Sequence, residues 1–384
     1  MVYEPQEDSA LLAKHVAVLA YGKVLDMGTG TGIQAFTAAG SSKVTSVLAT
    51  DIDKEAIDHA KKNNPHDKIA YKVSDLFSSV KGVFDTIIFN PPYLPAEQGL
   101  TDQALVGGKH GYETMCRFLH QALNHLSREG QIIASYSSLT RPEKVEECAR
   151  QLLYDFKELD RQHVFFEDLL VVRFVMSDAR KRLEGDGFKS IAYLAKGKRG
   201  MVFTSRFKGK KVAIKVKNPD SQAIASILHE AEMLKRLGKE GIGPKFIDSS
   251  DLYVAYVFVD GIPILDFIER SSKPRILKVL KAAIQQCRKL DKIGISKEEM
   301  TRPIKHILIA KGDKPVMIDF ERAHFTQRPH NVTQFCQFLS SGLLRFSLAS
   351  KGIRLDEERA GSLAKEYSDS LSDDSFKAIL SMVR

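Results

Sequence analysis

The chain has 384 residues, 43% of them hydrophobic and 27% charged, a composition typical of two globular domains in water. It has no run of about 18 apolar residues as in a membrane span, its acidic start MVYEPQEDSALL is unlike a signal peptide, and its four cysteines form no CxxC pair. We therefore expect a cytoplasmic protein with no membrane contact and no built-in zinc site.

The net charge of +9 is unevenly distributed along the chain. Residues 1–180 contain 19 Lys and Arg against 24 Asp and Glu, a net charge of −5, so the remainder carries +14. This difference favours two domains with different partners. The basic half can contact RNA or a ribosome, or it can simply have a lysine-rich surface.

The first half alternates strand-like and helix-like segments. Strands are predicted at 23–28, 46–53, 68–75, 86–90 and 130–138, and a final strand pair at 156–162 and 169–176. Helices are predicted from about residue 33 and at 55–64, 113–126 and 145–156. This order predicts a doubly wound parallel α/β sheet that ends in an antiparallel hairpin.

The charged stretch SDARKRLEGDG (177–187) marks the domain boundary. After it come hairpin-like strands at 190–216, a helix at 223–238, a strand pair around 253–261 and mostly helical residues. We therefore predict a first domain at 1–178, a linker at 179–187 and a second domain at 188–384.

A glycine-rich turn, VLDMGTGTG, follows the first predicted strand. Gly28 and Gly30 allow a ligand to approach the backbone and the helix N-terminus. The spacing is not GxGxxG, and the carboxylate of Asp26 would repel a pyrophosphate but attract a cationic or amino-acid group. Asp51, at the end of the second strand, can bind both hydroxyls of a ribose, and Asp75 would lie near an adenine. S-adenosylmethionine fits this set.

The fourth strand ends in IIFNPPY, which places Asn90, Pro91, Pro92 and Tyr93 where open α/β sheets bind ligands. An NH2 group conjugated to a carbonyl or a ring is a poor nucleophile because its lone pair is delocalised. The Asn90 oxygen and a prolyl carbonyl can accept its two hydrogens, the prolines make the turn rigid, and Tyr93 can stack on the planar group. We therefore interpret these four residues as catalytic.

These motifs resemble the HemK-type class I methyltransferases, and most closely the archaeal and eukaryotic branch that modifies class I release factors. YEPQEDS (3–9) and the glycines of GGKHG (107–111) match that branch. The resemblance implies a seven-stranded sheet, a cofactor cavity lined by Asp8, Ser9 and Asn90, and a glutamine amide held by Asn90 and Tyr93. It also implies a release factor or other translation protein as substrate, and a small zinc-containing activator protein as partner.

Two other functions remain open at this point. An N6-adenine methyltransferase would need base flipping and a large recognition surface, which a compact acidic domain lacks unless the basic half holds the nucleic acid. A binding module in which both ligands are regulatory is the third reading. A protein loop needs much less recognition surface, so we place glutamine first.

The second half holds, in order, elements that resemble a protein kinase. They are a glycine loop with Gly197, Gly200 and Val202, then Lys215 in VAIK, Glu230 in a helix, and Asp319 in MIDFE. The resemblance implies that Lys215 binds ATP phosphates and pairs with Glu230. It also implies that Asp319 holds Mg2+.

The catalytic loop departs from the kinase pattern, in which an Asp base precedes a metal-binding Asn by five residues. Here His306 stands at the Asn position, Thr301 at the base position, and the nearest carboxylate is Glu299. Imidazole is a poor ligand for Mg2+, which prefers oxygen. This pattern resembles the atypical RIO-like archaeal kinases, so we expect an α+β kinase-like domain with ATP near Glu299 and His306. Phosphoryl transfer, hydrolysis and a switch role all remain open.

Overall fold

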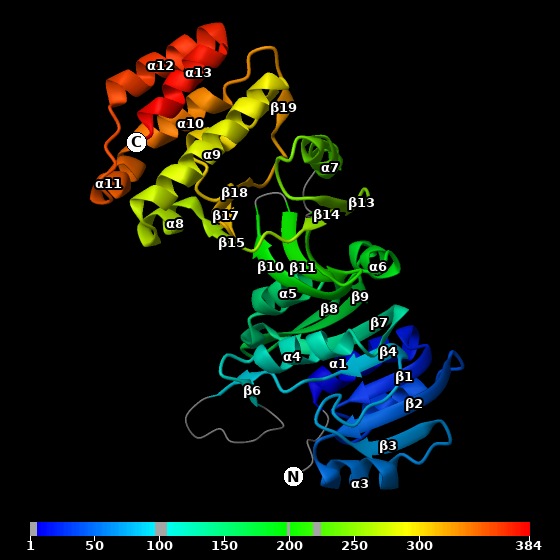
Figure 1. The fold of residues 1–384 in the computed structure, drawn as a ribbon. Helices are drawn as coiled ribbons and strands as arrows, with labels where there is room; N and C mark the ends of the chain where they lie inside the picture. Colours follow the sequence, from blue (N-terminus) through cyan, green and yellow to red (C-terminus); the bar gives the residue numbers. More distant parts are fainter. Residues whose placement is uncertain (1–5, 97–105, 198–199, 218–223) are drawn as a thin grey trace. The chain divides into compact units, whose positions relative to one another are not determined.

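The computed structural model describes residues 6–96, 106–197, 200–217 and 224–384, so Tyr3, Glu4 and Pro5 of the opening motif lie outside the described residues. The chain divides into two compact units, Met1–Asp186 and Gly187–Arg384 (Figure 1). Each unit has its own hydrophobic core. None of the described helices combines the length and the apolar character that crossing a membrane requires.

Unit 1 is built on a seven-stranded sheet of order β3-β2-β1-β4-β7-β9-β8. Its strands are β1 (Gly22–Met27), β2 (Val44–Asp51), β3 (Ile69–Val73), β4 (Phe84–Phe89), β7 (Leu126–Ser137), β8 (Tyr154–Val164) and β9 (Glu167–Met176). The first five in this order pair in parallel, whereas β9 is antiparallel to both β7 and β8. The predicted class I methyltransferase sheet is confirmed.

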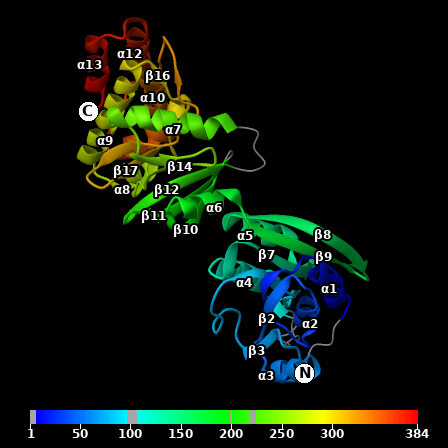
Figure 2. The ribbon, with the colours of Figure 1, turned by 90° about the vertical axis from the view of Figure 1, so that its right-hand side faces the viewer.

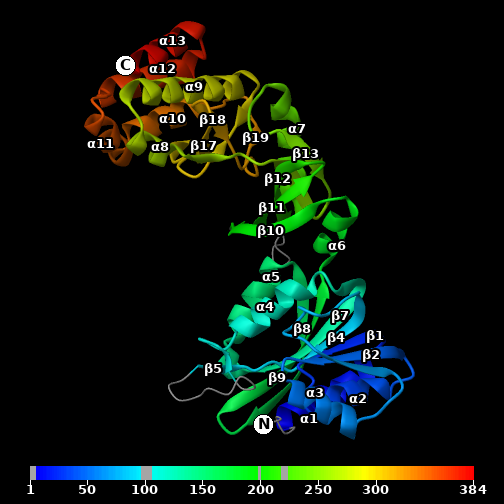
Figure 3. The ribbon, with the colours of Figure 1, turned by 60° about the horizontal axis from the view of Figure 1, so that its bottom comes forward.

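Helices cover both faces of this sheet (Figure 3). They are α1 (Glu7–Leu19), α2 (Ile33–Ala39), α3 (Lys54–Asn63), α4 (Glu113–Ala122) and α5 (Pro142–Gln151). The short helix η1 (Ser138–Thr140) follows β7, and α6 (Asp178–Gly185) follows β9. Consecutive strand residues belong to different core clusters: Ile87 packs with α4 and α5, and Ile88 packs with α1 and α2. Both faces of the central strands are therefore buried, which is why these strands read as continuous apolar runs.

Several boundaries differ from the prediction. The helix expected at 113–126 ends at Ala122, and the strand expected at 130–138 begins at Leu126. The helix expected at 145–156 ends at Gln151, and β8 begins at Tyr154, because Leu153 takes a left-handed backbone (φ +59°) that interrupts the helix. Most of the stretch expected as a linker, 179–187, is the helix α6, which begins after an N-cap by the Ser177 side chain. The short strands β5 (Leu94–Pro95) and β6 (Val106–Gly108) form a separate parallel pair.

Unit 2 begins with a five-stranded antiparallel sheet of order β10-β11-β12-β14-β13. Its strands are β10 (Lys189–Lys196), β11 (Gly200–Phe207), β12 (Lys210–Lys217), β13 (Phe246–Ser249) and β14 (Tyr253–Val257). The helix α7 (Ile224–Lys239) lies along this sheet and contacts β12, β13 and β14 (Figure 2). The expected hairpins and the expected helix are therefore present in this order.

The rest of unit 2 is mostly helical. Its elements are β15 (Gly261–Pro263), α8 (Ile264–Arg270), α9 (Lys273–Lys292), β16 (Ile295–Ser296), η2 (Glu298–Thr301), β17 (Ile307–Ala310), β18 (Lys314–Met317), β19 (His324–Phe325), α10 (Asn331–Ser340), α11 (Gly342–Ser350), α12 (Glu357–Ser370) and α13 (Asp373–Met382). The strand β17 pairs with β15 and β18, and β16 pairs with β19. These short strands hold the loops of 297–306 and 318–323 next to each other.

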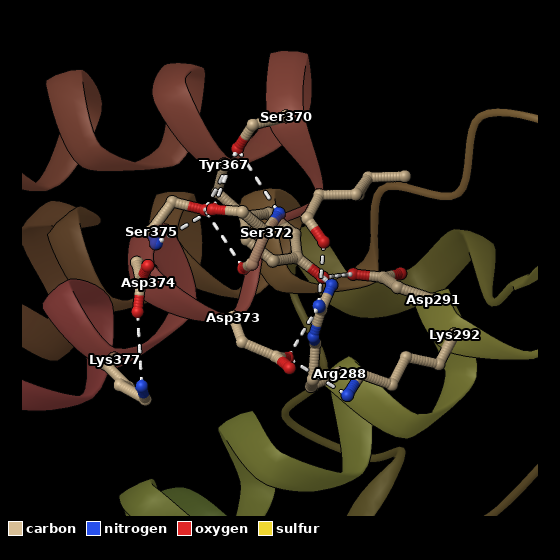
Figure 4. A network of polar contacts seen from close by, with 11 residues as sticks. Arg288, Asp291, Lys292, Tyr367, Ser370, Ser372, Asp373, Asp374, Ser375 and Lys377 are labelled. Carbon is tan, nitrogen blue, oxygen red and sulfur yellow. Dashed lines mark hydrogen bonds and ion pairs between the residues drawn. The ribbon is translucent and has the colours of Figure 1, made fainter.

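A buried polar network ties α9 to the C-terminal helices (Figure 4). The Tyr367 hydroxyl donates to Asp291 Oδ2 at 2.9 Å and accepts from Arg288 Nη1 at 2.7 Å. Asp291 Oδ1 accepts from the side chain of Asn331 at 2.6 Å, and Asn331 Oδ1 accepts from the backbone N of Lys297 at 2.7 Å. Burial raises the pKa of Asp291, against the hydrogen bonds from Asn331 and Tyr367. The network thus fixes the segment that begins at Lys297.

Candidate functional site

The carboxyl ends of β1, β2, β4 and β7 bring the predicted residues of unit 1 to one edge of the sheet. Met27 pairs with Thr50 on β2 and with Phe89 on β4, and Phe89 pairs with Ala134 on β7. The residues that follow, including Gly28, Asp51 and Asn90, must therefore lie next to one another. This is the edge at which open α/β sheets bind ligands.

The glycine turn between β1 and α2 has the left-handed backbone that only glycine adopts without strain. Gly28 has φ +64° and Gly30 has φ +53°. A Cβ placed on Gly30 would have no heavy atom within 4 Å among the described residues, whereas one on Gly28 would lie 3.4 Å from the Phe89 ring. The turn is therefore open at Gly30 and packed against β4 at Gly28.

Asp26 lies beneath this turn and is only 1% exposed. Its Oδ2 accepts a hydrogen bond from Thr29 Oγ1 at 2.6 Å and another from the backbone N of Ala35 at 3.0 Å. Burial outweighs both hydrogen bonds and raises the pKa of Asp26 from 3.8 to about 7. The carboxyl group therefore holds the turn against α2 as well as offering a negative charge beneath it.

The other two predicted carboxylates differ in environment. Asp51 Oδ2 accepts from the backbone N of Gly30 at 2.9 Å, so its side chain lies against the glycine turn. Asp75 lies two residues beyond the end of β3, is about half exposed, and pairs with Arg117 at 3.2 Å. The structure brings Asp51 to the turn, whereas Asp75 is an exposed residue beyond the edge strand β3.

The Asn90 side chain, just past β4, is held from two sides. Its Nδ2 donates to Asp8 Oδ2 at 3.0 Å and to Ser9 Oγ at 3.3 Å, and both residues lie in the first turn of α1. Its Oδ1 accepts from Ser135 Oγ on β7 at 2.6 Å. Asp8 and Ser9 are predicted to line the cofactor cavity. They directly contact Asn90, the residue predicted to hold the substrate amide.

The residues after Asn90 pack against the glycine pair of β6. A Cβ on Gly107 would lie 2.5 Å from the backbone oxygen of Pro92 and 3.0 Å from the Tyr93 Cα, so a larger residue would displace this turn. Pro91 is buried, and Tyr93 packs against both core clusters. Burial, followed by the charge of Asp8, raises the pKa of Tyr93, so its phenol stays neutral. The GGKHG element thus packs closely against the NPPY turn.

This site fits S-adenosylmethionine better than a nucleotide phosphate. Its backbone cradle is open at Gly30, and the side chains around it are the carboxyl groups of Asp26 and Asp51. A carboxylate attracts the cationic sulfonium and ammonium groups of this cofactor and can accept hydrogen bonds from a ribose. We would place the cofactor on the turn, with Asn90 at the methyl end.

A second cluster of charged residues lies in unit 2, around Lys215 on β12. Its Nζ lies 2.9 Å from Glu230 Oε2 on α7, 3.0 Å from Asp319 Oδ1 and 2.8 Å from Glu321 Oε2. Burial alone would lower the pKa of Lys215, but these carboxylates outweigh it and raise the pKa. The predicted pair of Lys215 and Glu230 is therefore formed, and Glu321 is an additional partner.

The glycine loop lies beside this cluster. Val202 pairs directly with Lys215 across β11 and β12, and Gly200 lies so close to β12 that a Cβ there would be 2.6 Å from the Val216 oxygen. Gly197 donates its backbone N–H to the Gly200 oxygen at 2.8 Å. Residues 198 and 199 at the tip lie outside the described residues. The two described ends of the loop, Gly197 and Gly200, are therefore hydrogen-bonded to each other, and Gly200 lies beside β12.

Asp319 follows β18 in a left-handed conformation, with φ +63°. Burial would raise its pKa, but the ammonium groups of Lys215 and Lys297 outweigh burial and lower the pKa, so Asp319 stays ionised. Lys297 is fully buried, donates to the backbone oxygen of Asp319, and lies 3.1 Å from Glu299 Oε2. His306 Nδ1 lies 3.7 Å from Asp319 Oδ2. The predicted Glu299, His306 and Asp319 therefore meet at one place.

The carboxylates of this cluster suit a divalent cation. One oxygen each from Glu230, Asp319 and Glu321 lie within 4.8 Å of one another. Hard oxygen ligands of this kind are those that Mg2+ prefers. Burial lowers the pKa of His306, which favours a neutral imidazole, and this is a weaker ligand for Mg2+ than an oxygen atom. The acidic residues, rather than His306, would therefore hold the ion.

Three residues of these sites were missed from the sequence. Ser135 lies inside the apolar strand IIASYS, and a serine there gives no signal by itself. The register of β4 with β7 would have found it, because Phe89 opposite Ala134 puts Ser135 beside Asn90. Glu321 stands in the quoted MIDFE segment, two residues from Asp319, but Lys297 has no motif around it.

Comparison with known proteins supports the assignment of unit 1. The family described as "Methyltransferase small domain" matches residues 4–160. A Methanocaldococcus jannaschii protein, for which protein N5-glutamine methyltransferase activity has been proposed, is 36% identical over 182 residues. This match covers 44% of the present chain and 90% of that protein.

Two further relatives carry related names. The mouse methyltransferase HEMK2 is 34% identical over 161 residues, which cover 38% of this chain and 75% of the mouse protein. The release factor glutamine methyltransferase of Lactococcus lactis is 32% identical over 122 residues, 29% of this chain and 45% of the bacterial enzyme. The chain thus spans less than half the length of the bacterial enzyme.

Proposed function

Because the chain belongs to the HemK-type N5-glutamine methyltransferase family, we propose that unit 1 methylates the side-chain amide of a glutamine in a translation protein. A class I release factor is the first candidate substrate, and S-adenosylmethionine is the methyl donor. The observation that carries the proposal is the Asn90 amide, held at the carboxyl end of β4 beside the open glycine turn. The catalytic residues are Asn90, Pro91, Pro92 and Tyr93.

The chemistry follows from the poor nucleophilicity of an amide nitrogen. When bound, S-adenosylmethionine supplies a methyl group activated by a positive sulfonium. The Asn90 oxygen and the backbone oxygen of Pro91 accept the two N–H groups of the substrate amide, so that the nitrogen lone pair turns towards the glycine turn. Tyr93, neutral and half-buried, packs on the planar amide and excludes water. The nitrogen would gain the methyl group as the bond between methyl and sulfonium sulfur breaks, with the neutral thioether S-adenosylhomocysteine as leaving group. The proton that the nitrogen loses would reach solvent when the products leave.

The rival function is N6-adenine methylation of DNA or RNA. The same clamp fits an exocyclic amine, and the basic second half would then hold the nucleic acid. Unit 1 itself is acidic, with 24 acidic against 19 basic residues in 1–180, and this charge disfavours a polyanion. The names of the relatives also point to glutamine, so we place the adenine reading second.

The test is methyl transfer from labelled S-adenosylmethionine to a release factor with a Gly-Gly-Gln tip, against an adenine-containing oligonucleotide. We expect label on the release factor and not on the oligonucleotide. The opposite result would exclude the glutamine proposal and favour the rival. That a small zinc-containing activator protein is a partner stays a prediction from the family resemblance. Adding such a protein to this assay and measuring the rate of methyl transfer tests it.

For the second domain, predicted at 188–384, we propose a kinase-like fold that binds ATP with Mg2+. The supporting observation is the contact of Lys215, which pairs with Val202 of β11, with Glu230, Asp319 and Glu321. Glu299 and His306 would lie near the phosphates. Whether the domain transfers phosphate, hydrolyses ATP or acts as a switch is decided by following labelled ATP with and without unit 1 substrates. RNA or ribosome contact through the basic surface is part of this proposal.

A further inference from the structure

We propose that Asp8 and Ser135 are positioning residues that lock the orientation of the Asn90 amide and thereby select substrates that donate an N–H group. The inference rests on the proposed methyltransferase function of unit 1. It concerns three segments that are distant in the sequence: the start of α1, the end of β4 and the end of β7.

The hydrogen-bonding capacity of the Asn90 side chain is almost fully used within the protein. A primary amide has two N–H donors and an oxygen with two acceptor positions. Both donors have partners, in Asp8 Oδ2 and Ser9 Oγ. Among the described residues, Ser135 Oγ is the one hydrogen-bond donor to Oδ1, at 2.6 Å. The second acceptor position on Oδ1 is what this side chain can offer to a substrate.

The hydrogen-bond partners also determine the orientation of the Asn90 amide. The oxygen and nitrogen of an amide have almost the same size, so packing alone does not prevent a 180° flip. A carboxylate accepts hydrogen bonds and cannot donate them, so Asp8 attracts Nδ2 and repels Oδ1. Ser135 donates from the other side. The flipped amide would face a carboxylate with its oxygen and would lose both interactions.

Burial makes this discrimination strong. Asp8 and Ser9 are each 3% exposed, and Ser135 is 1% exposed. Water cannot replace a lost partner there, and the charge of Asp8 is little screened. A flipped Asn90 would also present an N–H to the substrate N–H, which is repulsive. The lock therefore rejects acceptor groups without an N–H, such as a glutamate carboxylate in place of glutamine.

Four variants test the lock. Asp8→Asn keeps the shape but removes the carboxylate, so the amide at 90 can take both orientations. Ser135→Ala removes the donor to Oδ1. The double variant D8N/N90D reverses the pair: the amide introduced at 8 donates to the carboxylate introduced at 90, whose other oxygen still accepts. Ser177→Ala is the matched control, because it removes a buried serine hydroxyl that caps α6, outside this cluster.

The assay measures kcat, the KM for a Gly-Gly-Gln peptide and the Kd of S-adenosylmethionine. We expect kcat to fall about tenfold in Asp8→Asn and about fivefold in Ser135→Ala, since one hydrogen bond in a buried site has about this effect. The Kd of the cofactor should change less than twofold in Ser135→Ala, and Ser177→Ala should leave kcat unchanged. The double variant should be more active than either Asp8→Asn or Asn90→Asp alone.

The inference fails if Asp8→Asn and Ser135→Ala keep the wild-type kcat, or if the double variant is no better than both single variants. A failure of the proposed substrate is distinguishable, because the same variants can be assayed with an adenine oligonucleotide if that is the acceptor. NMR of the side-chain amide of Asn90 tests the inference without an activity assay. The two side-chain N–H signals of Asn90 should be protected from exchange in the wild type, and Asp8→Asn should lose that protection; unprotected wild-type signals would overturn the lock.

Discussion

The substitution Asp26→Asn tests the interpretation of the glycine turn as a cradle with a buried carboxyl group. Asparagine has the same shape, and its oxygen can still accept from Thr29 Oγ1 and from the backbone N of Ala35, as the Asp26 Oδ2 does. The variant therefore removes the ionisable group while it keeps the hydrogen bonds. The difference between the two proteins reports the titration of Asp26 alone.

The sign of the effect follows from the raised pKa. Folded Asp26 has a pKa of about 7 against an ordinary value of 3.8, so at pH 5 the folded protein keeps a proton that the unfolded chain releases. This proton stabilises the fold at low pH, and the stabilisation is lost as the pH rises through 7. With about 1.4 kcal/mol per pKa unit, the free energy of unfolding should fall by about 2.5 kcal/mol between pH 5 and pH 8.

The assay must report on unit 1 alone, because a chain of two units need not unfold in one step. The chain has no tryptophan, so pulse proteolysis in urea, with unit 1 fragments identified by mass, is the suitable readout. Relative to wild type, Asp26→Asn should gain about 2.5 kcal/mol as the pH rises from 5 to 8. It should also bind S-adenosylmethionine more weakly at pH 8. If the free energies of unfolding of the two proteins changed in parallel with pH, the raised pKa of the buried Asp26 would be refuted.

Further predictions concern both units. Asn90→Ala should abolish methyl transfer and leave the cofactor Kd nearly unchanged; full activity would contradict the acceptor assignment. Lys215→Ala should lose ATP binding by calorimetry, and unchanged affinity would remove the nucleotide proposal. Tyr367→Phe removes the hydroxyl that donates to Asp291 Oδ2 and accepts from Arg288 Nη1, so unit 2 should lose about 1–3 kcal/mol in urea proteolysis; unaltered stability would show that the network is not structural. RNA binding by the basic half should weaken steeply as salt rises from about 50 to 200 mM, and salt-independent or absent binding would contradict this role.

The fold and much of the unit 1 site could be predicted because they depend on features that are local in the sequence, namely the succession of strands and helices and the residues at strand ends. Parallel strands end at one edge, so Asp51 at the end of β2 and Asn90 after β4 had to come close to the glycine turn, and they do. Left-handed glycines and a Pro-Pro turn are likewise local features. The helix end at Gln151 was missed, because a left-handed Leu153 has no signature in the sequence.

The partners of the functional side chains could not be predicted, since they depend on register and on long-range packing. Ser135 is 45 residues from Asn90, and only the exact pairing of β4 with β7 places it there. Lys297 contacts Asp319 because β16 pairs with β19 and because Asn331 fixes its backbone. Such contacts determine the orientation and the charge environment of the predicted residues, as Asp8 does for Asn90. They leave no motif in the sequence.

The most direct test of the central claim is to locate the methyl group on the substrate. The protein is incubated with S-adenosylmethionine and a release factor, and the digested substrate is analysed by fragmentation mass spectrometry. We expect one methyl group on the side-chain nitrogen of the Gly-Gly-Gln glutamine, and none when Asn90→Ala replaces the wild type. A methyl group on adenine of added nucleic acid, with an unmodified glutamine, would contradict it.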